Sequence, residues 1–185
     1  IFILIALAYR KKLASRKAKS LKSETSSDMH PVEDILDSRH YDFSRQSICF
    51  FGGFKVKDRN GEDITDLFTP TLKSLLIILI LYTVKNEKGI SGNKLLQALW
   101  FDKTEESAKN NRNVYMSKLR NILERLGDVK IVNQKGFWSI CFEDYTICAY
   151  MEAKRLFAEQ AGNEDTLERL VELLLRGAVL PNVED

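Results

Sequence analysis

The sequence predicts an α+β fold in which a small antiparallel sheet comes first, three helices and a β-hairpin follow, and a helical hairpin comes last. Two observations carry this prediction. Short apolar segments bounded by a glycine pair and an Asn-Gly dipeptide are typical of strands. Longer runs with an apolar residue at every third or fourth position are typical of amphipathic helices. With 44% apolar residues among 185, the chain is long enough to bury one core and part of a second.

The folded part begins with three short strand-like segments. They read ICFF at 48–51, FKVK at 54–57 and DIT at 63–65. Glycine-containing turns separate them, which favours an antiparallel sheet.

The first helix is predicted to start at the Thr69-Pro70 pair. Thr is a good N-cap and Pro is favoured at the first helical position. Its apolar stretch, 75–84, has roughly half of the twenty residues that a membrane span needs. We therefore expect a buried central helix.

Two more helices and a hairpin follow. Ser91 is the expected N-cap of a short helix over 93–100, and a long helix is expected over 104–127. On a helical wheel, one face of the long helix collects Ala108, Tyr115, Met116, Ile122, Leu123 and Leu126, and the opposite face collects Glu106, Asn110, Asn113, Val114, Ser117 and Asn121. Residues 129–142 read as two strands around a basic turn at 133–136. This order of elements predicts a winged helix-turn-helix preceded by an N-terminal antiparallel sheet and closed by a wing hairpin.

The two ends of the chain differ from its middle in composition. Residues 1–9 are apolar, and 10–22 hold seven Lys or Arg and no acid. Cations directly after an apolar run mark the cytoplasmic side of a membrane helix. We expect 1–22 to be the end of a single-pass transmembrane helix in the inner membrane, with all residues after Arg10 in the cytoplasm. A basic amphipathic arm lying on anionic lipid is the alternative. Residues 23–47 are rich in Ser, Asp and Glu and predict a linker, and 143–185 predict a truncated helical pair.

Nothing in the sequence points to catalysis. The three cysteines lack zinc-like spacing and predict reduced, buried side chains, and His30 and His40 lie in a polar connector without a partner. The glycine pair at 52–53 has no following Lys-Ser, so it is not a phosphate-binding loop. We expect no enzyme activity, no metal and no cofactor.

The outward face of the 104–127 helix predicts a surface that binds double-stranded DNA. It offers amides and a hydroxyl where a plain solvated face has mostly Glu and Lys, and cations flank it. The residues expected to contact DNA are Lys109, Asn110, Arg112, Asn113, Ser117, Lys118, Arg120 and Lys135.

These residues have different expected roles. Asn110 and Asn113 suit bidentate contacts to adenine, and Ser117 suits a base or a phosphate. The Lys and Arg side chains suit phosphates, with Lys135 at the hairpin tip reaching the neighbouring minor groove or backbone. Arg112 lies near the core side of the wheel, so its stem should pack while its head reaches towards the DNA backbone.

Three segments carry a resemblance to a known family: ALWFD at 98–102, the long helix with SAKNNRNVYMSKLRNIL, and GFWSI at 136–140. With them, 48–142 resembles the winged-helix domain of SARP-type bacterial transcriptional activators, itself similar to the effector domain of two-component response regulators. LLLRGAVLP, at 173–181, looks like the start of the activator domain of that family, an array of tetratricopeptide-like helix pairs. Response-regulator recognition helices usually carry several Arg, whereas this one has fewer cations, so no particular base sequence carries over.

The resemblance implies a transcription regulator that binds double-stranded DNA and contacts RNA polymerase or other transcription machinery. The N-terminal segment fits a regulator that is tethered to the membrane as part of a signal-transduction protein. A homodimer is possible. A protein-interaction scaffold that uses the winged helix and the C-terminal helices without DNA is the alternative function. The scaffold alternative is favoured by 143–185, which holds ten acids and four bases, because DNA phosphates repel acids. Residues 48–142 hold fifteen bases and ten acids, and this mild excess permits DNA binding.

Overall fold

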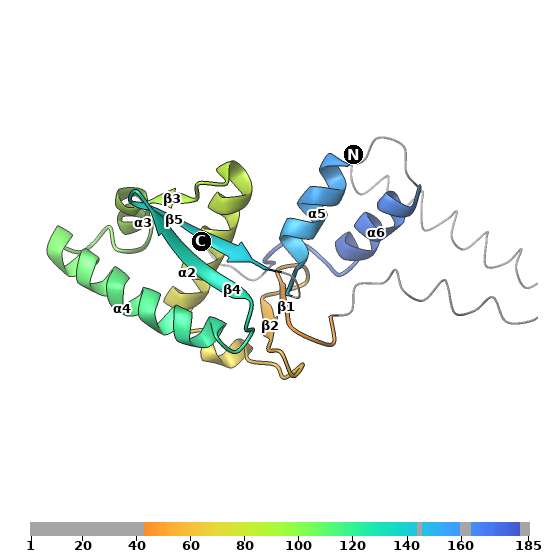
Figure 1. Cartoon of the computed structure of the whole chain (residues 1–185), viewed down its shortest axis with the longest axis horizontal. Coiled ribbons are helices and arrows are strands. Elements are labelled where there is room, and N and C mark those ends of the chain that lie inside the picture. The colour runs from red at the N-terminus through yellow and green to blue at the C-terminus, as the bar shows by residue number, and fades with distance from the viewer. Residues whose placement is uncertain (1–42, 144–145, 160–163, 182–185) are drawn as a thin grey trace, which may run out of the picture.

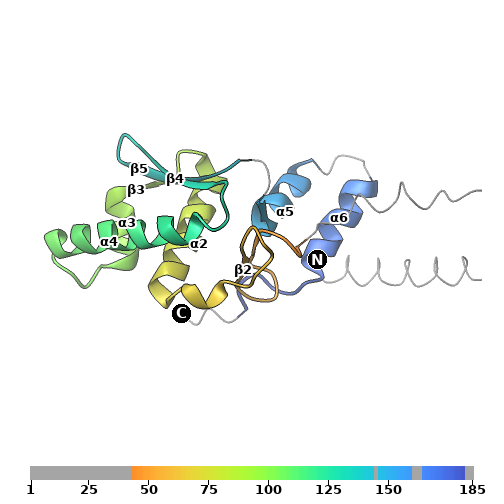
Figure 2. The same ribbon diagram turned by 60° about the horizontal axis from the view of Figure 1, so that its bottom comes forward.

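The computed structural model describes residues 43–143, 146–159 and 164–181, with only the backbone described for Glu164. The expected membrane segment 1–22 and most of the expected linker, with both histidines, lie outside the described residues. None of the helices in the described ranges is both long and apolar enough to cross a bilayer. Helices and two small sheets form a mixed α+β fold. Figures 1 and 2 show α2, α3, α4 and the hairpin at one end, α5 and α6 at the other, and β1 and β2 between them.

The first sheet is mixed, in contrast to the antiparallel sheet that the sequence predicts. β1 (Ser47–Cys49) pairs antiparallel with β2 (Lys55–Lys57), but on its other side it pairs parallel with β6 (Ile147–Cys148). The predicted strand at 63–65 is wrong: Asp63 makes one bridge to Lys57, and the 3-10 turn η3 (Thr65–Leu67) follows. The Asp63 carboxylate accepts a hydrogen bond from the Thr65 amide at 2.9 Å, which favours a turn over a continued strand.

The central helix α2 (Pro70–Asn86) is buried, as its short apolar stretch predicts. Its buried residues are Leu72, Leu75, Leu76, Ile77, Leu79 and Ile80. Thr69 occupies the N-cap position without a side-chain capping bond, and Pro70 begins the helix. Near the other end, the Thr83 hydroxyl accepts a hydrogen bond from the Ile140 amide at 3.0 Å, which ties α2 to strand β5.

Helices α3 (Gly92–Leu99) and α4 (Glu105–Leu123) correspond to the two predicted helices, but α4 ends at Leu123, before the predicted end at 127. Ser91 and Thr104 are their N-caps, and each hydroxyl accepts a backbone N–H three residues later at 3.4 Å. The buried residues of α4 are Ala108, Met116, Leu119 and Leu123. The rings of Trp100 and Tyr115, whose centres are 5.9 Å apart, hold the end of α3 against α4.

The hairpin pairs β4 (Val129–Gln134) with β5 (Phe137–Phe142), and β3 (Ile90–Ser91) pairs with the other edge of β5. Its turn is tighter than the predicted 133–136, because Gln134 and Phe137 are already paired. Lys135 and Gly136 have φ angles of 51° and 81°, and a two-residue turn with both φ angles positive matches the right-handed twist of the strands. The Gly92 amide donates to the Gly136 carbonyl at 2.9 Å, so the turn is fastened to the start of α3.

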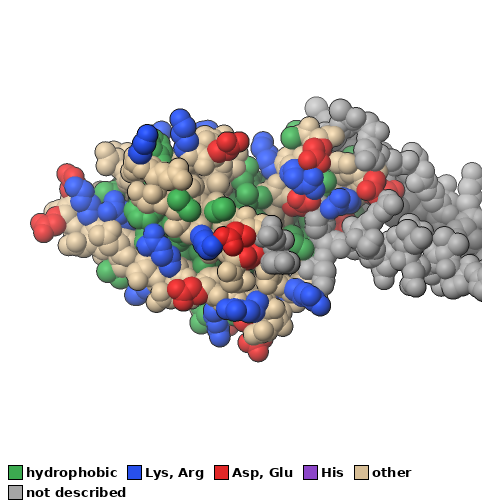
Figure 3. All heavy atoms as spheres, viewed as in Figure 1, with side chains coloured by type: hydrophobic (Ala, Val, Ile, Leu, Met, Phe, Trp, Pro, Cys, Tyr) green, Lys and Arg blue, Asp and Glu red, His purple; other side chains and the backbone are tan. Residues whose placement is uncertain are grey.

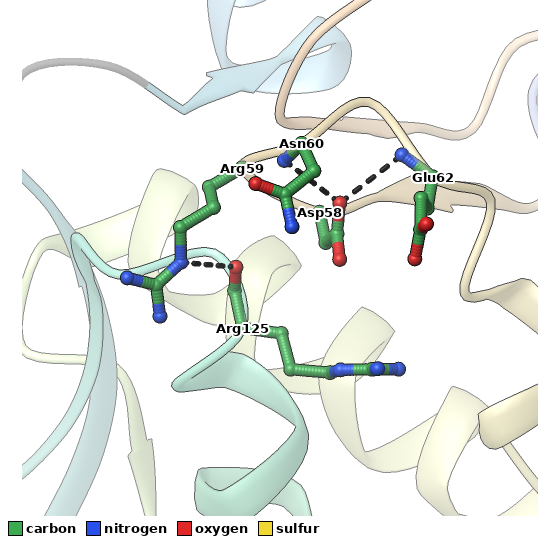
Figure 4. A pocket seen from close by; sticks show the side chains of 5 residues that line it. All are labelled: Asp58, Arg59, Asn60, Glu62 and Arg125. Atoms are coloured by element: carbon green, nitrogen blue, oxygen red, sulfur yellow. Dashed lines mark hydrogen bonds between the residues drawn. The ribbon is translucent and has the colours of Figure 1, made fainter.

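The C-terminal end of α4 is held by the turn after β2 (Figure 4). The Arg59 guanidinium donates to the carbonyls of Glu124 at 2.9 Å and Arg125 at 3.3 Å. The last carbonyls of a helix lack intrahelical partners, so these bonds cap α4. The buried Asp58 carboxylate accepts the amides of Asn60 and Glu62, at 2.8 and 3.1 Å, and shapes the turn that presents Arg59.

The two predicted C-terminal helices are present as α5 (Ala149–Ala158) and α6 (Glu164–Leu174). They enclose a second core with Phe51, whose other buried members are Ala149, Ala153, Leu156, Leu170 and Leu173. The helical pattern stops at Leu174, and the chain then returns to the end of β1: the Gly52 amide donates to the Ala178 carbonyl at 2.9 Å, and the Leu180 amide donates to the Phe50 carbonyl at 2.8 Å. Residues beyond the predicted boundary at 142 thus complete the N-terminal sheet.

The prediction of three buried cysteines is confirmed only for Cys148. Cys148 is buried and Cys49 is half-buried, but Cys141 is exposed. Cys141 is on β5 between Ile140, which is buried, and Phe142, which packs against the core. Because side chains alternate along a strand, Cys141 points outwards.

Candidate nucleic-acid interface

The outward face of α4 is exposed as the helical wheel predicts. Asn110, Asn113 and Ser117 are exposed along one side of the helix, with Lys109, Lys118 and Arg120 beside them. Arg112 is half-buried, in line with its place near the core side of the wheel. The amide and hydroxyl groups and their flanking cations therefore share one solvent-facing surface. We call this surface the α4 face: Lys109, Asn110, Asn113, Val114, Ser117, Lys118 and Arg120.

Val114 is the apolar member of the α4 face and is not among the residues expected from the sequence to contact DNA. Its side chain is 50% exposed between the polar residues. The wheel places it outward, so periodicity was sufficient to find it. An exposed apolar side chain in such a row suits the methyl group of thymine, which no amide or cation reads.

Arg112 connects α4 to the hairpin. Its guanidinium carbon lies 5.6 Å from the centre of the Trp138 ring, within the range of a cation–π contact. Its Nε and Nη2 atoms lie 3.3 and 3.0 Å from the Oδ1 atom of Asn113. Arg120 also lies over Trp138, at 5.7 Å. One tryptophan of β5 thus gathers two arginines of α4, a role that the sequence pattern did not indicate.

The lysines of the α4 face differ in how much of their charge is free. Lys109 forms an ion pair with Glu105 at 2.6 Å, one helical turn earlier. The hydrogen bond from Lys109, and then its charge, lower the pKa of the Glu105 carboxyl. Lys118 instead lies over the ring of Tyr115 at 5.5 Å. A contact with an aromatic ring leaves a lysine its full charge, so Lys118 is better suited than Lys109 to a phosphate contact.

Lys135 lies at the hairpin tip, beside a hollow of about 580 Å³. The hollow joins the start of α3, the hairpin turn and Arg112, and its lining is Ser91, Gly92, Asn93, Arg112, Asn133, Lys135, Gly136, Phe137 and Trp138. It therefore brings Lys135 and Arg112, two of the predicted contacts, to the same side of the molecule. Both offer only hydrogen-bond donors, which suits an anionic ligand.

Charge over this part of the surface is mixed. In Figure 3, Lys and Arg side chains are scattered over the region of α4 and the hairpin, with Asp and Glu between them. Glu105 and Glu106, in the first turn of α4, are among these acids and complement the helix dipole. A mixed surface attracts polyanions only moderately, so the amides must contribute much of any binding.

The described residues contain no cluster of His, Cys, Asp and Glu with metal-site geometry. The chain was compared with protein-family models, with curated proteins and with solved structures, and none of them matches it.

Proposed function

We propose that the chain is a sequence-specific DNA-binding transcriptional regulator whose helix α4 lies in the major groove. The observation that carries this proposal is the α4 face, where exposed amides and a hydroxyl alternate with cations beside a hairpin. An α-helix is about 10–12 Å wide and the major groove is about 12 Å wide, so one helix fills it.

The order of the elements supports a winged helix-turn-helix as the fold that presents α4. A helix, a short strand, two helices and a hairpin follow one another, and the sheet has the order β3-β5-β4. In such an arrangement the third helix reads base edges while the hairpin contacts the backbone or the minor groove. The bond from Gly92 to Gly136 and the contact of Arg112 with Trp138 keep the hairpin close to α3 and α4.

Within this proposal the side chains divide the work by chemistry. Asn110 donates and accepts, which suits adenine, and Val114 suits the thymine methyl group. Lys118, Arg120 and Lys135 hold phosphates, and Ser117 contacts a base or a phosphate. Lys109 shares its charge with Glu105, so it contributes less than Lys118.

The decisive experiment selects binding sites for the full chain from a random duplex library and then compares variants on the selected site. Asn113→Ala should reduce discrimination between the selected site and its single-base variants. Lys118→Ala should weaken binding to all of them by the same factor, because a phosphate contact carries no sequence information. Lys154→Ala, at an exposed position of α5, is the matched control and should change neither. If Asn113→Ala and Lys118→Ala bind DNA as the wild type does, α4 is not the helix that recognises DNA.

The membrane anchor belongs to the same proposal and rests on the sequence of 1–22. An apolar run followed by cations would hold the DNA-binding part at the cytoplasmic surface of the inner membrane. Flotation of membranes from cells that express the chain tests it: sedimentation as a free protein would contradict the anchor without affecting DNA binding.

A protein-interaction role is the second candidate, and an apolar hollow of about 550 Å³ favours it. The hollow lies between α5 and α6, and its apolar lining includes Phe51, Phe157, Leu174 and Val179. Phe157, Leu174 and Val179 are each more than 40% exposed. Such a surface is typical of a protein contact. A regulator that recruits transcription machinery would use both surfaces, whereas a scaffold would use this one alone and would not bind duplex DNA.

A further inference from the structure

Among the described residues, the side-chain amide of Asn113 is hydrogen-bonded at one end only: its carbonyl oxygen is bonded to Arg112, whereas its NH₂ group has no hydrogen-bond partner. Two nitrogens of Arg112 lie against the same end of the amide, at 3.3 and 3.0 Å. A guanidinium group only donates hydrogen bonds, so the atom that faces it is the carbonyl oxygen. The reverse orientation would set the NH₂ group against the donors of the guanidinium, which has no acceptor.

Arg112 is held in place from a second side. The Arg112 guanidinium carbon is 5.6 Å from the centre of the Trp138 ring. The Nη1 atom of Arg112 lies beside Gly92, 3.5 Å from where a Cβ of that residue would be. Trp138 is itself positioned by the pairing of β3 with β5, in which it lies opposite Ile90. The Arg112 guanidinium is therefore supported by the hairpin on one side and bonded to Asn113 on the other.

We infer that Arg112 sets the base preference of Asn113 by holding its carbonyl oxygen, so that Asn113 presents hydrogen-bond donors alone and reads guanine instead of adenine. This inference rests on the proposed function. It changes the expectation for Asn113 from the sequence, whereas the adenine role proposed for Asn110 is unaffected.

The chemistry of the major groove gives the reason. An asparagine reads adenine by accepting from N6 and donating to N7, which needs a free oxygen as well as the NH₂ group. Guanine presents two acceptors, O6 and N7, in the same place. An amide whose oxygen is occupied by a cation offers two N–H groups, which match guanine and leave the N6 amino group of adenine without a partner. An unsatisfied polar group at a contact is costly, so the pair selects against adenine.

The test first locates the base pair that Asn113 contacts, as the position where Asn113→Ala loses discrimination on the selected site. At that position the wild type should prefer guanine over adenine by about tenfold, the range of one good base contact. Arg112→Ala should shift the preference towards adenine, because it frees the oxygen. Arg120→Ala is the matched control: it removes the same charge and a similar contact with Trp138, at 5.7 Å. Because Arg120 is proposed to hold a phosphate, this variant should weaken binding to every base by the same factor and keep the preference for guanine.

A second measurement needs no variant and so does not depend on the folding of one. Hypoxanthine carries the O6 and N7 acceptors of guanine, and 2,6-diaminopurine carries the N6 and N7 pattern of adenine, so the wild type should bind the first like guanine and the second like adenine. A preference for adenine at this position, or a preference for guanine that Arg112→Ala leaves unchanged, overturns the inference. Failure of the proposed function looks different: the chain then selects no site, or Asn113→Ala changes discrimination at none of its positions.

Discussion

The guanidinium of Arg59 lies 2.9 Å from the carbonyl oxygen of Glu124, so a side chain from the turn after β2 caps the last turn of α4. The bond joins residues that are 65 positions apart in the chain. A cation at this end of a helix also interacts favourably with the helix dipole. The N-terminal sheet is in this way connected to the helix that carries the candidate interface.

Arg59→Ala should lower the free energy of unfolding by about 1 kcal/mol, because it removes two hydrogen bonds from the end of α4. Urea denaturation measures the change. Arg125→Ala is the control: Arg125 lines the same pocket, but it contributes its backbone carbonyl and not its side chain to the cap (Figure 4). Equal losses in the two variants would show that the cap does not contribute.

Gly89 and Gly136 provide a matched pair for the packing of the hairpin, because both have a φ of 81°. A Cβ on Gly89 would lie 1.9 Å from the carbonyl oxygen of Trp138, whereas a Cβ on Gly136 would meet no atom within 4 Å. Gly136→Ala should cost about 1 kcal/mol, the strain of a left-handed alanine. Gly89→Ala adds an overlap that forces β3 away from β5 and should cost about 3 kcal/mol in total. Thermal unfolding compares them; an equal loss in both would mean that β3 does not pack against β5 as described.

The cysteines should differ sharply in reactivity. Burial raises the pKa of the Cys148 thiol to about 12, so the reactive thiolate form is scarce at pH 8. Cys141 is exposed. In variants that keep one of these two cysteines, a thiol reagent should label Cys141 in the folded protein and Cys148 only in denaturant. Labelling of both at the same rate would contradict the burial of Cys148.

The same thiol links stability to pH. The folded state holds the proton of Cys148 more tightly than the unfolded state does, because its pKa is raised. Its contribution to the free energy of unfolding is therefore complete below about pH 9 and is lost as pH rises from there towards 12. Cys148→Ala should flatten this part of the pH dependence; an unchanged profile would assign the alkaline loss to other groups.

Glu106 offers a test in which binding should improve. It is an exposed acid on the outward side of the first turn of α4, where it would repel the phosphates of a bound duplex. Glu106→Gln should tighten DNA binding by about threefold at low salt, and the gain should shrink as salt is added. Glu62→Gln, at an exposed position of the turn beside the opposite end of α4, should leave affinity unchanged. A gain in both variants would point to net charge alone as the cause.

Most of the helices could be predicted because their signals are local. The Thr69-Pro70 start, the Ser91 cap and the apolar periodicity of α4 each depend on residues within a few positions of one another. β3 and β6 could not be predicted, since a strand of two residues shows no alternation and exists through its partner far along the chain. The return of 178–180 to the end of β1 is of the same kind.

In the candidate site, too, the features with local signals could be predicted, and those that depend on contacts between side chains could not. The period of the helix was enough to place Asn110, Asn113 and Ser117 on one exposed face. It said nothing of rotamers, and so nothing of the bond between Arg112 and Asn113 or of the pairing of Lys109 with Glu105. The sequence places Trp138 on a strand but does not show its contact with two arginines, because that contact depends on how the hairpin lies against α4.

The salt dependence of duplex binding tests the central claim most directly. The full chain, with Lys118→Ala and the α5 control Lys154→Ala, is titrated with a fluorescent random duplex at several salt concentrations. We expect the logarithm of the binding constant to fall linearly with the logarithm of salt concentration, and Lys118→Ala to reduce the slope by about one while Lys154→Ala leaves it unchanged. Absence of binding at low salt, or a slope that Lys118→Ala does not alter, would contradict the account, because α4 would then not be the part of the chain that holds DNA.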